Sequence, residues 1–231
     1  MIMTVKDRYE IVLENIKKAC ERSGRNPEDI TLISVTKTHG AELINEAIDA
    51  GAKDIGENKA QELCNKYDDV KPVRWHFIGH LQTNKVKTIV DKVVMIHSVD
   101  SDKLASEIDK RAKSSGVVMD ILVEINIGME DSKSGATEEE ARDLIKKIRD
   151  EYQNLRVRGL MCVPPITDNP ENSRKYFKKL KDIFDSIKEL SEDEYFDTLS
   201  MGMSGDYEVA IEEGATVVRV GTAIFGAREY R

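Results

Sequence analysis

Short apolar segments alternate with longer amphipathic segments along the whole chain, and this alternation restricts the possible folds more than any other feature. Eight apolar segments are predicted as strands, at residues 32–35, 54–56, 75–78, 94–97, 118–125, 157–161, 198–201 and 217–220. The segments between them are predicted as helices, at residues 41–50, 59–66, 85–90, 101–114, 137–151, 170–190 and 207–213. A repeated strand–helix unit is typical of a parallel sheet with crossover helices.

The number of units predicts how the sheet is arranged. Eight units in 231 residues fit an α/β fold in which residues 1–231 form one (β/α)8 TIM-barrel domain. A doubly wound open sheet is the alternative, because periodicity does not distinguish a closed sheet from an open one. An extra amphipathic helix precedes the first strand, and we expect Thr4 to cap it and Gly24 to end it.

Composition argues against several classes of partner and compartment. The formal net charge of −8 gives no basic footprint for nucleic acid, and no apolar run approaches the length that crosses a membrane. The chain becomes charged within its first residues, so we expect no signal peptide. Cys20, Cys64 and Cys162 form no CxxC pattern, so we expect free thiols in a reducing cytoplasm.

A lysine closes the first predicted strand. In a (β/α)8 barrel the carboxyl ends of the strands hold the chemistry, and Lys37 falls at such an end. A primary amine at this place can form a Schiff base with a carbonyl compound. Taken alone, a solvated surface lysine is the alternative, so the assignment of Lys37 depends on what the other strand ends carry.

The loops after the seventh and eighth strands carry small and hydroxyl residues, where such barrels usually bind phosphate. Ser204 is predicted to cap the helix through Tyr207, which leaves backbone N–H groups available near its start. Gly221 lets the backbone approach a ligand closely, and Thr222 offers an N–H and a hydroxyl. Ordinary turn glycines are the alternative in each loop. A strand-end amine, a phosphate cup and an arginine together favour pyridoxal 5′-phosphate (PLP) as the ligand.

Two further polar residues allow two interpretations each. Arg219 lies between valines in the eighth strand and must find a polar partner. It either pairs with a carboxylate, Glu57 or Glu124, or faces the pyridine nitrogen of PLP. An arginine keeps its proton, so it would leave that nitrogen unprotonated and weaken the ring as an electron sink. Asn58, after the second strand, either bonds the cofactor or caps the next helix.

Two histidines and one loop complete the candidates near this face. His76 and His80 are four residues apart but span a strand and its exit, so we predict no metal site. We assign His76 to structure and His80 to the rim of the pocket. The polar loop at residues 126–135 is interpreted either as a mobile lid or as a plain surface loop.

These motifs together resemble the pyridoxal phosphate homeostasis protein family of the YggS/PROSC type. The resemblance covers essentially the whole chain, with motifs at residues 35–38, 56–58, 76–85, 97–100, 159–161, 199–206 and 219–226. It implies a barrel similar to the alanine racemase N-terminal domain, PLP fold type III. It also implies that Lys37 carries PLP as an internal aldimine and that Arg219 faces the pyridine nitrogen. The remaining implied cofactor-binding residues are Asn58, Ser200, Ser204, Gly221 and Thr222.

The resemblance and the residues leave more than one function open. A non-catalytic carrier would bind PLP for intracellular storage and delivery, with PLP-dependent apoenzymes as recipients. An amino-acid racemase would need a second acid–base group. Racemases of similar fold take that group, a tyrosine, from a C-terminal β domain of a partner subunit. We expect no such domain here, and Tyr207 and Tyr230 are poor substitutes. We therefore expect a monomeric, cytoplasmic carrier. A lyase that forms a Schiff base with a phosphorylated sugar, without PLP, is a third alternative.

Overall fold

The strands close into a barrel in the computed structural model of this chain, which describes residues 3–130, 134–190 and 193–226. The eight strands pair in parallel, each with its neighbour in sequence. They are β1 (Thr31–Val35), β2 (Asp54–Glu57), β3 (Arg74–Phe77), β4 (Met95–Val99), β5 (Met119–Ile125), β6 (Leu155–Cys162), β7 (Thr198–Met203) and β8 (Val217–Val220). The first strand also pairs with the last, so the closed barrel is confirmed and the open sheet is wrong.

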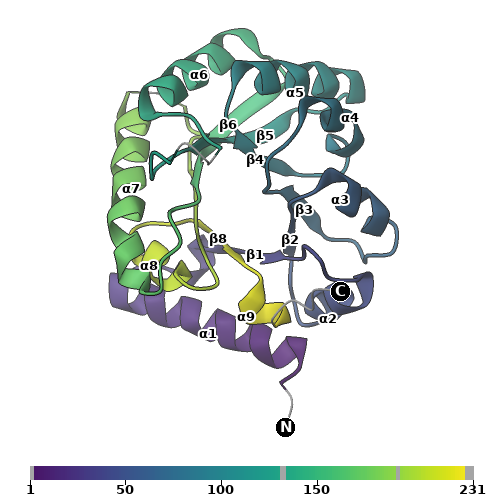
Figure 1. Cartoon of the computed structure of the whole chain (residues 1–231), viewed down its shortest axis with the longest axis vertical. Helices are drawn as coiled ribbons and strands as arrows, with labels where there is room; N and C mark the ends of the chain where they lie inside the picture. The colour runs from purple at the N-terminus through teal and green to yellow at the C-terminus, as the bar shows by residue number, and fades with distance from the viewer. Residues whose placement is uncertain (1–2, 131–133, 191–192, 227–231) are drawn as a thin grey trace.

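Helices surround the strands on the outside of the barrel (Figure 1). The α-helices are α1 (Val5–Ser23), α2 (Ala41–Asp49), α3 (Ala60–Lys66), α4 (Val86–Ile89), α5 (Asp102–Ser115), α6 (Glu138–Glu151), α7 (Arg174–Glu189), α8 (Tyr207–Glu212) and α9 (Thr222–Phe225). Three short 3₁₀ helices are η1 (Pro27–Asp29), η2 (Thr83–Lys85) and η3 (Pro170–Ser173). Helix α9, a single turn that begins one residue after β8, was not among the predicted helices.

The additional N-terminal helix forms as predicted. Thr4 accepts a hydrogen bond from the backbone of Asp7, and the Asp7 carboxylate accepts from the backbone of Thr4, which is a complete capping box. Gly24 ends α1 in the left-handed conformation that glycine adopts without strain. In Figure 1, α1 lies outside β8 and β1, alongside α8 and α9, where it completes the ring of helices.

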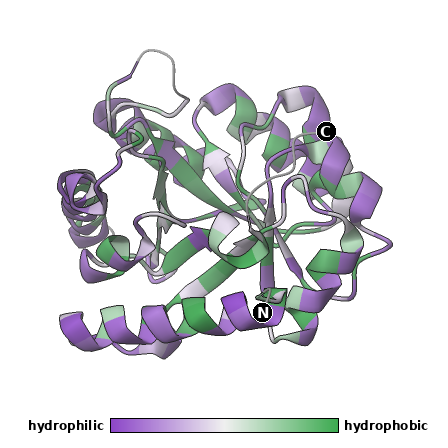
Figure 2. Cartoon of the chain, turned by 60° about the horizontal axis from the view of Figure 1, so that its bottom comes forward, coloured by the Kyte–Doolittle hydropathy of each residue, from purple (hydrophilic) through white to green (hydrophobic). Residues whose placement is uncertain are grey.

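Alternation along each strand separates an apolar outer face from a partly polar interior. In β8, Val218 and Val220 join the main apolar core between strands and helices, whereas Arg219 points inside the barrel. In β3, Trp75 and Phe77 belong to that core and His76 lies inside. In Figure 2 the strands are largely hydrophobic in colour, whereas the helices carry both colours, as helices with one apolar face do. The barrel interior therefore has room for a buried polar network.

Packing requires a glycine at one point of the barrel wall. Gly159 in β6 has φ of +152°, and a Cβ built there would lie 1.8 Å from the backbone oxygen of Thr198 in β7. The register of β5 against β6 also shifts beside it, between Ile121 and Leu122. Glycine permits both the close approach and the irregular pairing that bring β6 and β7 together.

The structure bears on two features used to predict the compartment, the state of the cysteines and the absence of a membrane-spanning segment. All three cysteines are free thiols, as predicted. In the described ranges, no helix combines the length and the apolar character that a membrane crossing needs.

Candidate functional site

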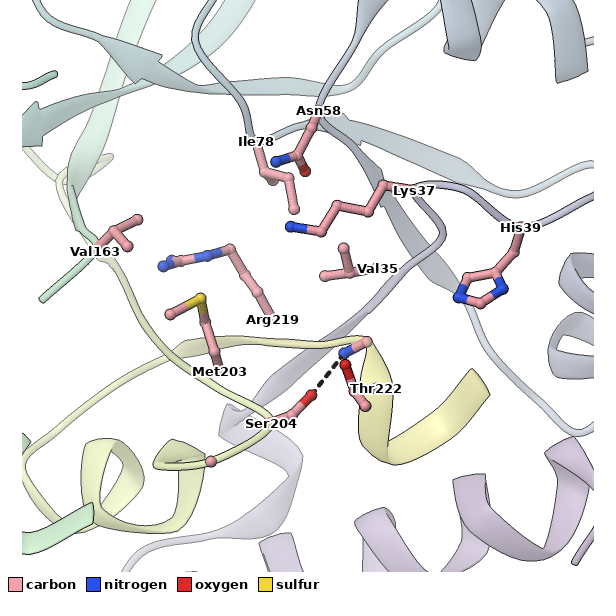
Figure 3. Close-up of a pocket in the computed structure, with 12 residues that line it drawn as sticks. Val35, Lys37, His39, Asn58, Ile78, Val163, Met203, Ser204, Arg219 and Thr222 are labelled. Atoms are coloured by element: carbon pink, nitrogen blue, oxygen red, sulfur yellow. Dashed lines mark hydrogen bonds between the residues drawn. The ribbon is translucent and has the colours of Figure 1, made fainter. Parts of the chain in front are cut away.

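A cavity of about 290 Å³ opens at the carboxyl ends of β1, β2, β7 and β8, where the sequence predicted the site. Its walls combine polar side chains with the apolar Val35, Ile78, Val163 and Met203 (Figure 3). Twelve residues line it: Val35, Lys37, His39, Asn58, Ile78, Val163, Met203, Ser204, Gly205, Arg219, Gly221 and Thr222. Six of the seven predicted binding residues are among them, and the seventh, Ser200, lies behind Arg219.

The side chain of Lys37 extends into this cavity toward Arg219 (Figure 3). The backbone around it is held in an uncommon conformation, because Thr38 has φ of +70°. Glu62 of α3 accepts a hydrogen bond from the Thr38 backbone N–H, and the hydroxyl of Thr36 donates to Glu57 at 2.8 Å. These bonds fix both neighbours of Lys37 and so define where its side chain leaves the barrel rim.

An ion pair between Glu57 and Lys66 stabilises the end of β1. Glu57 is fully buried, and burial raises the pKa of its carboxyl, although the Lys66 ammonium 2.8 Å away opposes the shift. Lys66 also donates to the carbonyl of Thr36 and to Glu62. Glu57 is therefore engaged with Lys66, and the predicted alternative that it pairs with Arg219 is wrong.

Ser204 joins the two loops that were predicted to bind phosphate. Its Oγ accepts hydrogen bonds from the backbone N–H of Gly221 at 3.0 Å and of Ala223 at 3.4 Å. The prediction that Ser204 caps α8 is wrong, because Asp206 occupies that N-cap position and the Ser204 hydroxyl reaches across to the start of α9. The result is a wall of hydroxyl and backbone groups contributed by both loops.

Glycine at position 221 is a packing requirement as well as a turn preference. A Cβ at this position would lie 3.3 Å from both the Cβ and the carbonyl oxygen of Val35, tighter than most real contacts. Thr222 follows it and also lines the cavity (Figure 3). The backbone of the β8 loop can therefore approach a ligand that sits over Val35 and Lys37.

Arg219 is buried and held by neutral groups. It donates to the Oγ of Ser200 at 2.5 Å and to the carbonyl oxygen of Cys162 at 2.8 Å. Burial lowers the pKa of the guanidinium, and the nearby Cys162 and Glu124 oppose that shift. Glu124 accepts its hydrogen bond from Ser134, so the predicted ion-pair alternative is wrong for this carboxylate too. The guanidinium therefore presents a permanent positive charge to the cavity.

Asn58 has a buried amide oxygen that lacks a hydrogen-bond partner within the described part of the chain. The alternative that it caps the next helix is wrong, because α3 begins after Lys59 and no side chain caps it. Its backbone packs against Gly79, where a Cβ would lie 2.4 Å from the Asn58 carbonyl oxygen. An unpaired buried oxygen beside a cavity marks a place for a ligand donor or for water.

The two predicted histidines occupy different environments. His76 is buried inside the barrel with its Nε2 2.9 Å from Asp54, in agreement with a structural role. His80 does not line the cavity, and its side chain is 61% exposed beside Asp100, so the assignment to the pocket rim is wrong. Ile78, directly after β3, still lines the cavity, whereas His80 two residues further along does not.

Among the residues that line the cavity, Ile78, Val163, Met203 and His39 were not predicted from the sequence. Ile78, Val163 and Met203 line the cavity, but an apolar residue at a strand end has no signal that separates it from the core. His39 lines the opposite side and stacks on Phe225. Within loop 126–135, residues 131–133 lie outside the described residues, as does Tyr230, so the lid hypothesis stays a prediction.

Comparison with known proteins gives consistent matches over most of the chain. Residues 10–229 match the alanine racemase N-terminal domain family. The pyridoxal phosphate homeostasis protein of Aquifex aeolicus (strain VF5) is 47% identical, over 99% of this chain and 100% of that protein. A crystal structure of an unknown protein from Bifidobacterium adolescentis has a TM-score of 0.89 at 35% identity, over 95% and 94% of the two chains. The structure of PipY of Synechococcus elongatus PCC7942 with PLP bound has a TM-score of 0.80 at 30% identity, over 92% and 100%.

Proposed function

Because the chain belongs to the pyridoxal phosphate homeostasis protein family, built on the alanine racemase N-terminal barrel, we propose that it binds PLP in the cavity described above and serves PLP homeostasis. The convergence of Lys37, Arg219 and the Ser204–Gly221 contact on one cavity carries this proposal. The residues fit the three functional ends of PLP, which are an aldehyde, a phosphate and a pyridine nitrogen.

The phosphate is assigned to the wall formed by Ser204, Gly221 and Thr222. The hydroxyls of Ser204 and Thr222 can donate to a dianion, as can backbone N–H groups of these loops other than those of Gly221 and Ala223, which the Ser204 Oγ already engages. Arg219 is assigned to the pyridine nitrogen and Asn58 to a polar edge of the ring. The unsatisfied Asn58 oxygen supports this assignment because a ligand group would give it a partner.

Lys37 is proposed as the Schiff-base lysine. Its amine nitrogen bonds the aldehyde carbon, and the aldehyde oxygen leaves as water, so hydrolysis reverses the bond and returns the free cofactor. Such reversibility is what storage and delivery require. The hydrogen bonds from Thr36 and Thr38 to buried and half-buried carboxylates support the role, because they fix the backbone from which Lys37 extends.

We propose storage and delivery to PLP-dependent apoenzymes, rather than catalysis, as the use of this binding. Bound PLP supplies an aldehyde and an electron-withdrawing ring, but Arg219 keeps its proton and so leaves the ring nitrogen unprotonated. A racemase also needs an acid–base group on the second face. Tyr207 does not line the cavity, and its hydroxyl accepts a hydrogen bond from Asn15 of α1. The three free thiols suit a reducing compartment, and we propose a cytoplasmic monomer.

The test is the visible absorption of the purified protein with PLP, followed by borohydride reduction and peptide mapping. We expect an absorption band from the lysine-bound cofactor and a label on Lys37. Lys37→Ala should lose both, whereas Lys59→Ala, an exchange at an exposed neighbouring lysine, should keep both. A label scattered over surface lysines would refute the site. Racemisation of alanine or serine that disappears in Lys37→Ala would instead support the racemase alternative.

A further inference from the structure

A continuous row of hydrogen-bonded side chains crosses the barrel interior behind Arg219. Each of five neighbouring residues is at most 5% exposed, and they come from five different strands. In order they are Asp54 (β2), His76 (β3), His97 (β4), Ser200 (β7) and Arg219 (β8), which we name the barrel chain. Asp54 is the first residue of its strand, so the barrel chain runs from the amino-terminal side of the barrel to the cavity at the carboxyl ends.

The two ends of the barrel chain have fixed roles. Asp54 is an acceptor: burial raises its pKa, but hydrogen bonds from His76 and Arg74 outweigh burial and hold the pKa below its ordinary value. Arg219 at the other end can only donate. Between them, burial above all, with His76 and Arg219 acting in the same direction, keeps the pKa of His97 well below its ordinary value, so His97 is neutral.

These fixed ends determine the direction of every bond between them. His76 donates from Nε2 to Asp54 at 2.9 Å, which leaves its Nδ1 to accept from His97 Nε2 at 3.0 Å. The Nδ1 of His97 then accepts from the hydroxyl of Ser200 at 3.0 Å. The oxygen of Ser200 remains to accept from Arg219. All four bonds point the same way, and in this order each histidine donates from Nε2 and accepts at Nδ1.

The opposite arrangement is worse for a physical reason. A proton on Nδ1 of His76 would make His97 donate to Ser200, which would then accept from both sides. Its hydroxyl proton would lose its acceptor in the barrel chain, and an unsatisfied buried donor is costly. A row of bonds aligned in one sense also polarises each member. Through it the Asp54 carboxylate acts on a guanidinium that has no carboxylate as a direct hydrogen-bond partner among the described residues.

We propose that the barrel chain positions the Arg219 guanidinium in the cavity, which makes Asp54, His76 and His97 positioning residues for PLP. This inference rests on the proposed function, since Arg219 is assigned there to the pyridine nitrogen. The barrel chain turns the oxygen of Ser200 toward Arg219 and the hydroxyl proton away. Ser200 thereby holds Nη1 while the Cys162 carbonyl holds Nη2, and Arg219 lines the cavity in this fixed orientation. None of the three positioning residues lines the cavity itself.

The first readout uses the protein without PLP. Long-range ¹⁵N–¹H NMR of the histidine rings should show the Nε2–H form for both His76 and His97 in the wild type. Asp54→Leu removes the terminal acceptor, so each arrangement then leaves one buried donor unpaired and the preference for Nε2–H is lost. The Nδ1–H form should therefore become populated on both rings, including His97, which does not contact residue 54. The matched control is Asp49→Leu, the same exchange at an exposed carboxylate, and it should leave both rings unchanged.

The second readout is the dissociation constant and the absorption spectrum of bound PLP. In Asp54→Leu we expect binding about tenfold weaker and a shifted band, because Arg219 no longer has one fixed orientation. Unchanged histidine tautomers, or PLP binding and spectrum equal to those of the wild type, would overturn the inference. If Asp54→Leu does not fold, Ser200→Ala breaks the last link without removing a charge. Asp54 still holds both rings in the Nε2–H form in this variant, so it is judged by the dissociation constant and the spectrum of bound PLP.

The two proposals fail in different ways. If the wild type binds no PLP, the proposed function fails and the role of the barrel chain toward PLP fails with it, whatever the tautomers are. If the wild type binds PLP on Lys37 but Asp54→Leu and Ser200→Ala bind it equally well with the same spectrum, only the inference about the barrel chain fails.

Discussion

The bridge from Ser204 to the β8 loop predicts a stability difference between two serine-to-alanine exchanges in the same barrel. Ser204→Ala removes the acceptor of two backbone N–H groups, one at 3.0 Å and a longer one at 3.4 Å. Loss of a comparable helix-cap acceptor costs about 0.5–2 kcal/mol. With the longer second bond included, we expect Ser204→Ala to lower the free energy of unfolding by about 1–2 kcal/mol. In a chain of this size, that lowers Tm by roughly 2–8 °C.

Ser34 is the matched control because its buried hydroxyl has no hydrogen-bond partner among the described residues. Replacing an unpaired hydroxyl with a methyl group should leave the free energy of unfolding within about 0.5 kcal/mol of the wild type, or raise it. Urea unfolding of both variants, followed by far-UV circular dichroism without PLP, separates this structural role of Ser204 from any contact with phosphate. Equal losses in the two variants, or no loss in Ser204→Ala, would refute the reasoning.

Three further predictions concern the scaffold. Gly159→Ala should lower the free energy of unfolding by more than about 3 kcal/mol or prevent folding, because the new Cβ would lie 1.8 Å from a backbone oxygen. Gly116→Ala is the control, since that residue is in the left-handed conformation with open space around it. It should lower the free energy of unfolding, measured with urea, by only about 1 kcal/mol. Burial first, with His76 and Arg219 acting in the same direction, depresses the pKa of His97 in the native protein. Below about pH 6.5 the histidine is therefore protonated in the unfolded chain but not in the native protein. The free energy of unfolding should therefore fall as pH drops from about 7.5 to 5, by up to about 1.4 kcal/mol per unit, and His97→Gln should flatten this dependence; an equal slope in the variant would contradict the assignment. Thr4→Ala should lower the free energy of unfolding by about 1 kcal/mol through loss of the α1 capping box, with Thr4→Ser close to the wild type.

The sequence determined the elements and the position of the site because those signals are local. Each strand and helix carries its own apolar period, so the eightfold alternation could be recognised without long-range information. Lys37 was assigned because it closes a strand, and the chemistry of a parallel barrel gathers at strand ends. Gly221 and Thr222 were assigned for the same reason, since they follow the last strand directly.

Only the tertiary structure decided closure and the choice of hydrogen-bond partners. Pairing of β1 with β8 joins segments from the two ends of the chain, and no local period encodes it. Ser204 was assigned to the nearest helix, but its donors lie on another loop, 17 and 19 residues further along the chain. His97 joins Ser200, 103 residues away, only because barrel register brings their inward faces together. Side-chain partners depend on register and closure, which exist only once the whole sheet has formed.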